Sequence, residues 1–389
     1  MSSIPLEQLA HRVYQWKEGQ IGPISLEIYP TIRCNLNCQF CDTTDRHRPP
    51  VSELSTTEWI NILTQAKHLG VLEVFVLGGG EPFVHVGIMD ILQCIKDLGM
   101  YGIITTNGTL ISKERSNQLI DMKWDEIHMS IDGAYAHTHD SLRGRSGSFK
   151  KTVSTLCRIR QKSTYNIQLT IHTVVNNHNY KEIPHIIELA EAIGIQRVDF
   201  DDIIAYTPEQ KKLVLTSVQR KELQSIAQKA SDLANQYGIA TTLEQYASTE
   251  QRIRGQDAPS SVPFFTKNTN KSEFQGLEFA PCFKPFYHLT LSADGKSSPC
   301  CVLASQGGRI QEYLQKNSPP ERNIHGKNIH DKNIHKNALQ NLWLQDPFLQ
   351  DIRQAMIHQK PLDRCKECSY NILRHENTIR THLIPQKTP

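Results

Sequence analysis

The stretch YPTIRCNLNCQFCDTTD, residues 29–45, contains three cysteines in CxxxCxxC spacing: Cys34, Cys38 and Cys41. A closed zinc site or a saturated iron–sulfur cluster takes four protein ligands, and this stretch provides only three thiolates. One interpretation is a [4Fe–4S] cluster in which one iron is left open for an exogenous ligand. The alternatives are a zinc site completed by a distant histidine, or three unrelated thiols.

Two further cysteines in the first 250 residues are poor candidates for the fourth ligand. Cys94 lies in the helical pattern IMDILQCIKDLG and Cys157 in TVSTLCRIRQ. A cysteine in such a pattern is most simply a small buried apolar residue. We therefore expect neither of them to complete the three-cysteine set.

Length and composition limit the class of protein. At 389 residues the chain exceeds one ordinary domain, so we expect a large α/β domain and a smaller companion. The net charge of +3 implies neither a nucleic-acid nor a membrane partner. Residues 1–20 lack a signal-peptide core, and no stretch has the roughly 18 apolar residues of a membrane span. With ten grouped cysteines, this predicts a cytoplasmic protein in a reducing compartment.

Apolar runs with strand character alternate with segments of helix length, which predicts an α/β fold with a parallel sheet. The predicted strands are 25–30, 73–80, 102–108, 126–133, 167–175 and 197–203. The predicted helices are 56–69, 88–99, 112–122, 148–162 and 180–193. A helix at 217–237 and a short strand at 239–244 follow. The pattern alone fits a doubly wound sheet or a full or partial barrel, with functional groups at the carboxyl ends of the strands.

Polar and glycine-rich motifs follow most of the predicted strands. GGGEP, residues 78–82, comes after one strand, and Asn107, Asp132 and Asn176 come after three others. Because the carboxyl ends of parallel strands share one edge, we expect these residues to converge with the cysteine stretch.

At this point the sequence resembles the radical S-adenosylmethionine (radical SAM) family. CxxxCxxC with Phe40 before the last cysteine resembles the family's cluster loop, GGGEP resembles its methionine-binding motif, and MSIDG resembles its fourth-strand motif. The resemblance implies a partial (β/α)6 TIM-like barrel. It also implies a [4Fe–4S] cluster bound by the three cysteines, with S-adenosyl-L-methionine on the open iron. A 5′-deoxyadenosyl radical would then abstract hydrogen from a substrate.

The resemblance also assigns cofactor contacts. Glycines at 78, 79 and 80 allow close backbone approach, and Glu81 can bind the cofactor's ammonium group. Ordinary strand-end polarity and turn completion compete with these roles at the later motifs. The candidate cofactor-binding residues are Phe40, Gly78, Gly79, Gly80, Glu81, Asn107, Ser130, Asp132, Arg143 and Asn176.

The C-terminal cysteines resemble the SPASM domain, in its shortened twitch form. The pattern from Cys282 to Cys300 resembles the opening of that domain, in which a hairpin holds auxiliary-cluster ligands, and CKEC supplies Cys365 and Cys368, with no cysteine after them. This implies a small auxiliary-cluster domain, a β-hairpin plus helix, with one auxiliary [4Fe–4S] cluster bound by four thiolates. A four-cysteine zinc site is the alternative.

The leftover Cys301 is either a packed thiol, a substitute ligand or a hydrogen-atom donor to a substrate radical. His325, His330 and His335 recur every five residues, a spacing that does not gather them on one face of a helix or strand, so we predict no metal site there.

Four segments are expected. These are an N-terminal helix or extension at 1–23, the radical SAM barrel at 24–247, a linker or mobile loop at 248–277, and the auxiliary-cluster domain at 278–389 with a loop insertion near 304–335.

The architecture implies modification of a ribosomally made precursor peptide by epimerisation, crosslinking or backbone excision. With about 24 residues before the first strand, a leader-recognition module is not expected. A separate protein would then recognise the leader peptide. Flavodoxin or ferredoxin would be the external electron donor. The alternative function is that of a small-molecule dehydrogenase acting on an alcohol such as an aminocyclitol. The second alternative is a non-catalytic metal-binding scaffold.

Overall fold

The computed structural model describes residues 4–5, 8–9, 11–13, 22–41, 52–163, 167–205, 207–247, 282–304, 338–358 and 365. The structural statements below concern these residues. None of the described helices has the length and apolar composition needed to cross a lipid bilayer.

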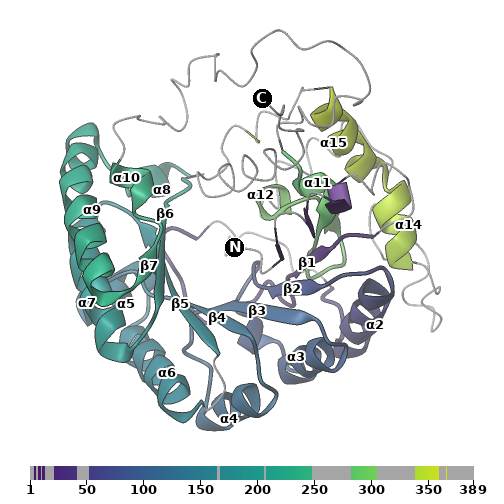
Figure 1. Cartoon of the computed structure of the whole chain (residues 1–389), viewed down its shortest axis with the longest axis horizontal. Helices are drawn as coiled ribbons and strands as arrows, with labels where there is room; N and C mark the ends of the chain where they lie inside the picture. The colour runs from purple at the N-terminus through teal and green to yellow at the C-terminus, as the bar shows by residue number, and fades with distance from the viewer. Residues whose placement is uncertain are drawn as a thin grey trace, which may run out of the picture.

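One open, largely parallel sheet forms the centre of the molecule, in the order β7-β6-β5-β4-β3-β2-β1-β8-β9. Its strands are β1 Ser25–Ile28, β2 Glu73–Val76, β3 Tyr101–Thr106, β4 Glu126–Ser130, β5 Gln168–Val175, β6 Arg197–Asp202, β7 Ala240–Thr241, β8 His288–Leu291 and β9 Ser297–Ser298. Only the β8–β9 pair is antiparallel. Figure 1 shows the strands along an arc, which confirms the predicted partial barrel.

Helices α2, α3, α4, α6, α7 and α9 lie on the convex side of this arc (Figure 1). The α-helices are α2 Thr56–His68, α3 Ile88–Asp97, α4 Lys113–Asp121, α5 Ala136–Arg143, α6 Ser148–Lys162, α7 Ile183–Ile193, α8 Pro208–Lys211, α9 Ser217–Tyr237, α10 Glu244–Ala247, α11 Lys284–Tyr287, α12 Cys301–Ala304, α14 Ala338–Gln345 and α15 Pro347–Ile357. Two 3-10 helices are η1 Pro82–Val84 and η2 Tyr180–Glu182.

Local sequence signals explain where the long helices begin and end. Ser55 and Glu58 form a reciprocal capping box at the start of α2, and Thr216 and Gln219 do the same for α9. Each pair satisfies amide groups that have no partner inside the helix. Gly238 ends α9 in the left-handed conformation.

The two faces of the sheet differ in chemistry. In β4, Ile127 and Met129 belong to the main apolar core, whereas Glu126, His128 and Ser130 alternate with them. Because side chains of a strand point to alternate faces, the helices cover the apolar face and the polar side chains line the inner face. The carboxyl edge of the sheet and this polar inner face therefore frame any functional site.

The six predicted strand–helix units are present, with three differences. The segment predicted as one helix at 180–193 begins with η2, and the short strand predicted at 239–244 is limited to β7. The sequence patterns did not predict α5 or α8. Both are short, and α5 lacks a side-chain N-cap.

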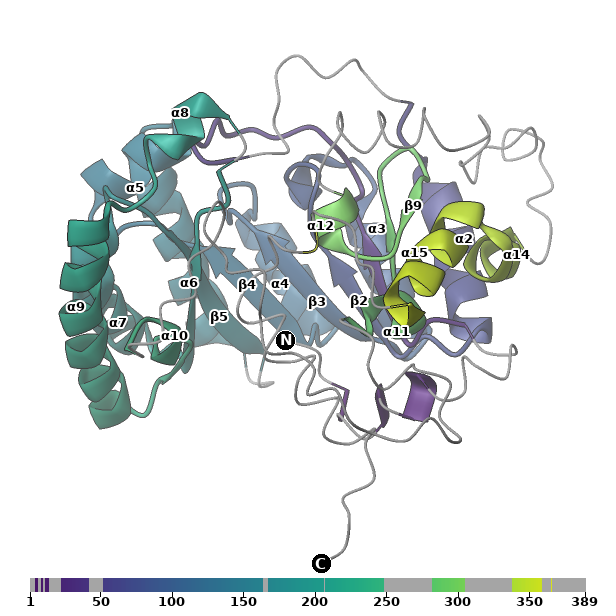
Figure 2. The same ribbon diagram turned by 90° about the horizontal axis from the view of Figure 1, so that it is seen from above.

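The C-terminal hairpin continues the same sheet, since β8 pairs with β1 from Ser25↔His288 to Ile28↔Leu291. Figure 2 shows α11, α12, α14 and α15 gathered beside this end of the sheet. A second apolar cluster joins Ile4, Leu9 and Val13 to Phe286 and other C-terminal residues. The expected segment boundaries stay predictions, and the linker 248–277 and the three histidines lie outside the described residues.

Candidate functional site

The cysteine loop, residues 34–41, follows β1 and is hydrogen-bonded to the last turn of α5. The amide of Asn37 donates to the carbonyl oxygen of Arg143 at 3.1 Å, and the amide of Gln39 donates to that of Leu142 at 2.9 Å. These contacts place the loop over the carboxyl ends of the strands. The unpredicted α5 is therefore the element that anchors it.

The three loop cysteines are all partly exposed. The amide of Leu36 donates to Cys34 Sγ at 3.4 Å. Burial raises the pKa of Cys34, and it raises the pKa of Cys38 to about 12. The raised pKa favours the protonated thiols of Cys34 and Cys38, and metal binding to these two sulfur atoms would release their protons.

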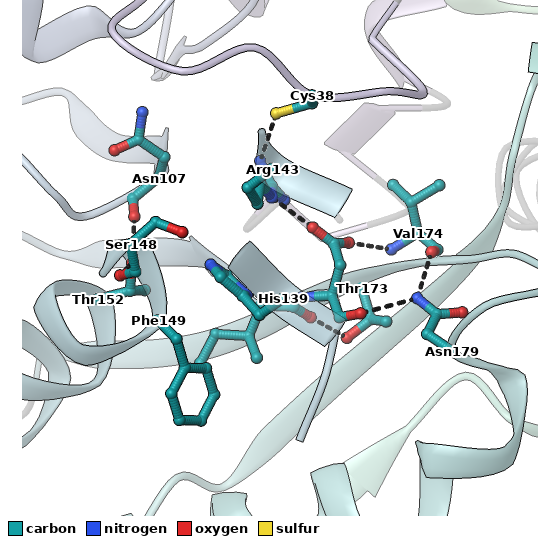
Figure 3. Close-up of polar contacts among 12 residues, drawn as sticks. Cys38, Asn107, His139, Arg143, Ser148, Phe149, Thr152, Thr173, Val174 and Asn179 are labelled. Carbon is teal, nitrogen blue, oxygen red and sulfur yellow. Dashed lines mark hydrogen bonds and ion pairs between the residues drawn. The ribbon is translucent and has the colours of Figure 1, made fainter. Parts of the chain in front are cut away.

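Arg143 connects the cysteine loop with β4. Its Nη1 lies 3.6 Å from Cys38 Sγ, its Nε donates to Asp132 Oδ2, and its guanidinium carbon lies 5.3 Å from the ring centroid of Phe40. Burial alone would lower the pKa of Arg143, but the Asp132 carboxylate and Cys38 outweigh it and raise this pKa. Figure 3 shows Arg143 pointing toward Cys38. A permanent positive charge thus lies beside one predicted cluster ligand.

Asp132 is fully buried and bonded on several sides. Its Oδ1 accepts from the amide of Val174 at 2.8 Å, and its own amide donates to His139 Nδ1 at 3.2 Å. Burial lowers the pKa of His139 to about 4, so its ring is neutral near pH 7. In Figure 3, His139 and Phe149 lie below this network, with ring centroids 5.6 Å apart. The arrangement fixes the Asp132 carboxylate against Arg143.

The glycine motif packs against the start of the cysteine stretch. Gly78 and Gly79 have φ of 69° and 65°, in the left-handed region that favours glycine. A Cβ at Gly80 would lie 2.1 Å from the carbonyl oxygen of Arg33, and one at Gly78 would lie 2.1 Å from the Tyr29 ring. The glycines are thus needed for contacts within the chain, in addition to the expected approach of a ligand.

Glu81 is buried behind this turn. Its carboxylate accepts from the amide of Asn107 at 2.8 Å, from Thr106 Oγ1 at 2.6 Å and from the amide of Phe83 at 3.2 Å. Burial raises its pKa in spite of these donors. Because a carboxylate has about four acceptor positions, one remains for a ligand ammonium group.

Asn107 and Asn176 both complete turns. Asn107 Oδ1 accepts from the amide of Thr109 at 2.9 Å, and Asn176 Oδ1 accepts from that of His178 at 2.9 Å. Asn107 has a second role, because its Nδ2 donates to Asn35 Oδ1 in the cysteine loop at 3.0 Å. Both asparagines therefore have structural partners, and their predicted cofactor contacts stay predictions.

Ser130 stands at the end of β4 and is 9% exposed. Within the described part of the chain its hydroxyl has no hydrogen-bond partner. It is therefore available to a bound molecule, and its predicted contact with the cofactor stays a prediction.

Tyr29 was not predicted as a site residue. Its ring contacts the position of Gly78, and its hydroxyl donates to Glu27 Oε1 at 2.7 Å. His288 Nε2 of β8 lies 3.4 Å from Glu27 Oε2. Charges on Cys301 and Cys300 contribute to the raised pKa of Tyr29, after burial and Glu27. Tyr29 thus lies between the glycine turn and the C-terminal cysteines, and an aromatic residue before a cysteine loop gave no distinctive signal for this.

The C-terminal cysteines gather around apolar packing. Cys282, Cys300 and Cys365 all pack against the second apolar cluster, and Cys301 begins α12. The predicted fourth ligand, Cys368, lies outside the described residues. None of the nine described cysteines forms a disulfide.

Single-ion coordination is not preformed at either place. Among the residues that the structure describes, no group of three His, Cys, Asp or Glu side chains could hold one metal ion. Cys94 packs against the main core, as expected for a small apolar residue. The three loop cysteines, with a buried guanidinium beside them, suit a larger cluster with separate thiolate ligands.

Family comparisons agree with this geometry. Residues 28–190 match the radical SAM superfamily, and residues 282–369 match SPASM, an iron–sulfur cluster-binding domain. The chain carries a radical SAM domain and a SPASM domain. The first implies a [4Fe–4S] cluster with S-adenosyl-L-methionine, and the second implies auxiliary iron–sulfur clusters.

Curated relatives match a little under half of the chain. The AdoMet-dependent heme synthase of Methanosarcina barkeri is 33% identical over 42% of this chain and 46% of the relative. The PqqA peptide cyclase of Methylocella silvestris is 30% identical over 46% of this chain and 47% of the relative. The chain thus spans about half the length of the curated relatives that it matches.

Solved structures share the fold over a longer range. Streptococcus suis SuiB bound to S-adenosylmethionine superposes with a TM-score of 0.62 and 20% identity, over 88% of this chain and 71% of SuiB. Native anSMEcpe with bound AdoMet superposes with a TM-score of 0.52 and 16% identity, over 76% of this chain and 82% of anSMEcpe. At this identity the likeness concerns the fold alone.

Proposed function

We propose that the chain is a radical SAM enzyme that modifies a ribosomally made peptide. The proposal of a radical SAM enzyme is supported by one observation. The cysteine loop, the glycine turn and the Arg143–Asp132 pair converge at the carboxyl edge of one parallel sheet. When bound and reduced, the cluster and S-adenosyl-L-methionine supply a 5′-deoxyadenosyl radical, which abstracts hydrogen from a substrate carbon.

The chain's residues have distinct roles at this edge. Cys34, Cys38 and Cys41 would hold the cluster through their three thiolates. Arg143 keeps a positive charge beside Cys38, and its pairing with Asp132 fixes that charge in place. A preorganised charge costs no rearrangement during the reaction.

The glycine turn and strand ends receive the rest of the ligand. Gly78 and Gly79 bring backbone groups close, Glu81 offers its remaining acceptor position to an ammonium group, and Ser130 offers its free hydroxyl. Phe40 covers the guanidinium of Arg143 and helps to exclude water.

The C-terminal cysteines hold one auxiliary [4Fe–4S] cluster in this proposal. Cys282, Cys300 and Cys365 share one apolar cluster, and Cys368 supplies the fourth thiolate. Saturation by four thiolates favours electron transfer over substrate binding. Cys301 remains a candidate hydrogen donor.

Two relationships support a peptide substrate. PqqA peptide cyclases are named for a peptide, and SuiB has a structure bound to the precursor peptide SuiA. A precursor peptide, a leader-recognition protein and a flavodoxin or ferredoxin donor are accordingly the proposed partners. The relative named as a heme synthase keeps a small-molecule substrate as the second candidate.

To test the proposal, the iron–sulfur clusters are first reconstituted under anaerobic conditions. The protein is then reduced with dithionite in the presence of S-adenosyl-L-methionine. We expect 5′-deoxyadenosine from the wild type and none above background from Cys34→Ala; equal yields would favour a non-catalytic scaffold. About eight irons per chain would support two clusters, whereas about four irons plus zinc would support the four-cysteine zinc alternative.

The substrate is then sought among short peptides encoded beside the gene, by mass spectrometry after incubation. A mass change that depends on Cys34 would support peptide modification. Deoxyadenosine formation without any modified peptide would favour the small-molecule alternative.

A further inference from the structure

Charged pairs line the inner face of the sheet on neighbouring strands. Parallel-ladder partners share a face, so the register Ser130↔His172 and His172↔Asp199 places these three side chains together. The nearest pair on β4 is Glu126–His128, whose side chains are only 10% and 13% exposed. Most charged side chains on this face are therefore paired with other side chains of the protein.

The His172–Asp201 pair is different because it is accessible. His172 Nε2 lies 2.8 Å from Asp201 Oδ2, and the two side chains are 30% and 29% exposed. Burial would lower the pKa of His172, but the bond to Asp201 and the charges of Asp201, Asp199 and Asp132 raise it. Asp201 thus favours the protonated ring, and a protonated imidazole donates from both nitrogens.

One of these donors has no partner in the chain. Nε2 faces Asp201, and Nδ1 of His172 makes no hydrogen bond to any described residue. Its strand neighbour Ser130 is nine-tenths buried and also lacks a partner among the described residues. Neither atom is among the fully buried polar atoms that lack a partner, so both groups, on adjacent strands and one face, are open to a bound molecule.

The pair lies directly beside the site described above. The amide of Ile131 donates to the carbonyl oxygen of His172 at 3.0 Å, and Ile131 separates Ser130 from Asp132. Asp132 in turn bonds to the amide of Val174, two residues after His172. A molecule that touches His172 is thus next to the Arg143–Asp132 network.

We propose that His172, oriented by Asp201, contacts the substrate and donates a hydrogen bond from Nδ1 to a backbone carbonyl oxygen of the bound peptide. The inference rests on the proposed function, which supplies the peptide. The charges here are paired, Asp201 with His172 at 2.8 Å and Asp199 with Arg197 at 2.9 Å, so no unpaired cation is offered to an anionic group and a neutral carbonyl oxygen fits the position. Asp201 acts as a positioning residue.

The test uses steady-state kinetics with the peptide that the wild type modifies. His172→Ala should raise the KM for this peptide about tenfold or more, since a hydrogen bond from a charged donor is lost. The KM for S-adenosyl-L-methionine should move far less, whereas a merely structural role would change both. His172→Gln keeps an N–H donor and should recover part of the loss.

A second measurement addresses Asp201. Asp201→Asn should raise the peptide KM by itself but add little in the His172→Ala background, because it acts through His172. The matched control is His185→Ala. His185 forms an exposed pair with Glu188 at 2.9 Å on α7 and should behave as the wild type.

The outcomes separate the two proposals. An unchanged peptide KM in His172→Ala, with active wild type, overturns the inference and leaves the proposed function standing. Equal rises in both KM values also overturn it. If the wild type cleaves S-adenosyl-L-methionine but modifies no peptide, the proposed function fails and this inference fails with it.

Discussion

The two cysteine sets of this molecule lie in different surroundings. The cysteine loop is fixed by hydrogen bonds, including those from Asn37 to Arg143 and from Asn107 to Asn35. In the C-terminal set, Cys282 and Cys300 pack against an apolar cluster, and the carbonyl oxygen of Cys300 accepts from Ser298 Oγ at 3.1 Å. Directional bonds define positions within a few tenths of an ångström, whereas apolar packing is non-directional.

This difference indicates which interactions position the cysteines of each site. The loop site is shaped by the strand ends and α5 before any metal binds. At the C-terminal site Cys282, Cys300 and Cys365 pack against one apolar cluster, and we expect the final geometry to depend on the metal as a further cross-link. The predictions below test that contrast, from the largest expected effect to the smallest.

The largest effect should come from a loop cysteine. Cys34→Ala removes one of three cluster ligands and should abolish 5′-deoxyadenosine formation, measured by chromatography after reconstitution. Because the two sites are separate, the iron of the C-terminal site should be retained. Cys94→Ala is the control, since Cys94 packs against the main core. Loss of all iron in Cys34→Ala would contradict the independence of the two sites.

Removal of iron by chelation should affect the C-terminal region most. Hydrogen exchange in α14 and α15 should accelerate about tenfold or more, because the metal cross-link contributes to local stability there. Exchange in β3 and β4 should change little. Equal acceleration in both regions would show that the loop site also needs its metal for order.

Gly80→Ala should disturb the hydrogen-bonded site. The new Cβ would lie 2.1 Å from the carbonyl oxygen of Arg33, so the backbone has to shift, at a cost of about 2–3 kcal/mol. Urea unfolding measures this loss, and iron bound by the loop should fall with it.

The control for Gly80→Ala is Gly147→Ala. A Cβ at Gly147 meets nothing within 4 Å, but its φ of 77° is strained for alanine, so we expect a loss of about 1 kcal/mol without loss of iron. If the two variants behaved alike, close packing at Gly80 would not matter.

The smallest effect is a pH dependence from His139. Its folded pKa is about 4, below the ordinary 6.5, so the unfolded chain binds a proton more readily. Stability from this group is full above pH 6.5 and is lost as the pH falls toward 4. Between pH 7 and 5 the loss should be about 2 kcal/mol.

Urea unfolding at both pH values checks this for His139. His139→Gln should lack this part of the dependence, and His137→Gln, a substitution at an exposed histidine nearby, should keep it. If the free energy of unfolding of His139→Gln depended on pH as strongly as that of the wild type, another group would be responsible for the effect.

The sequence predicted much of this fold because its strongest signals are local. Capping residues such as Ser55 and Glu58 mark α2, and strand runs with alternating polarity mark β4. The motifs at Gly78 and Asp132 could be placed because both follow strands, and parallel strands share an edge.

Other features could not be predicted because they depend on contacts between distant residues. Helix α5 lacks a side-chain cap and is stabilised by the loop that it anchors. His172–Asp201 joins residues 29 positions apart, and Tyr29 meets Gly78 only in the folded chain. The cofactor contacts themselves remain predictions, as does the role of Cys368.

The parallel pairing of β1 with β8 has a consequence for synthesis. Residues 25–28 leave the ribosome long before residues 288–291, so one edge of β1 has no partner during most of translation. An unpaired edge is a template for wrong pairing, and the delay should favour a nascent chain in which β1 is held back or protected. Completion of the sheet, and of the site at its carboxyl edge, is then one of the last events of folding.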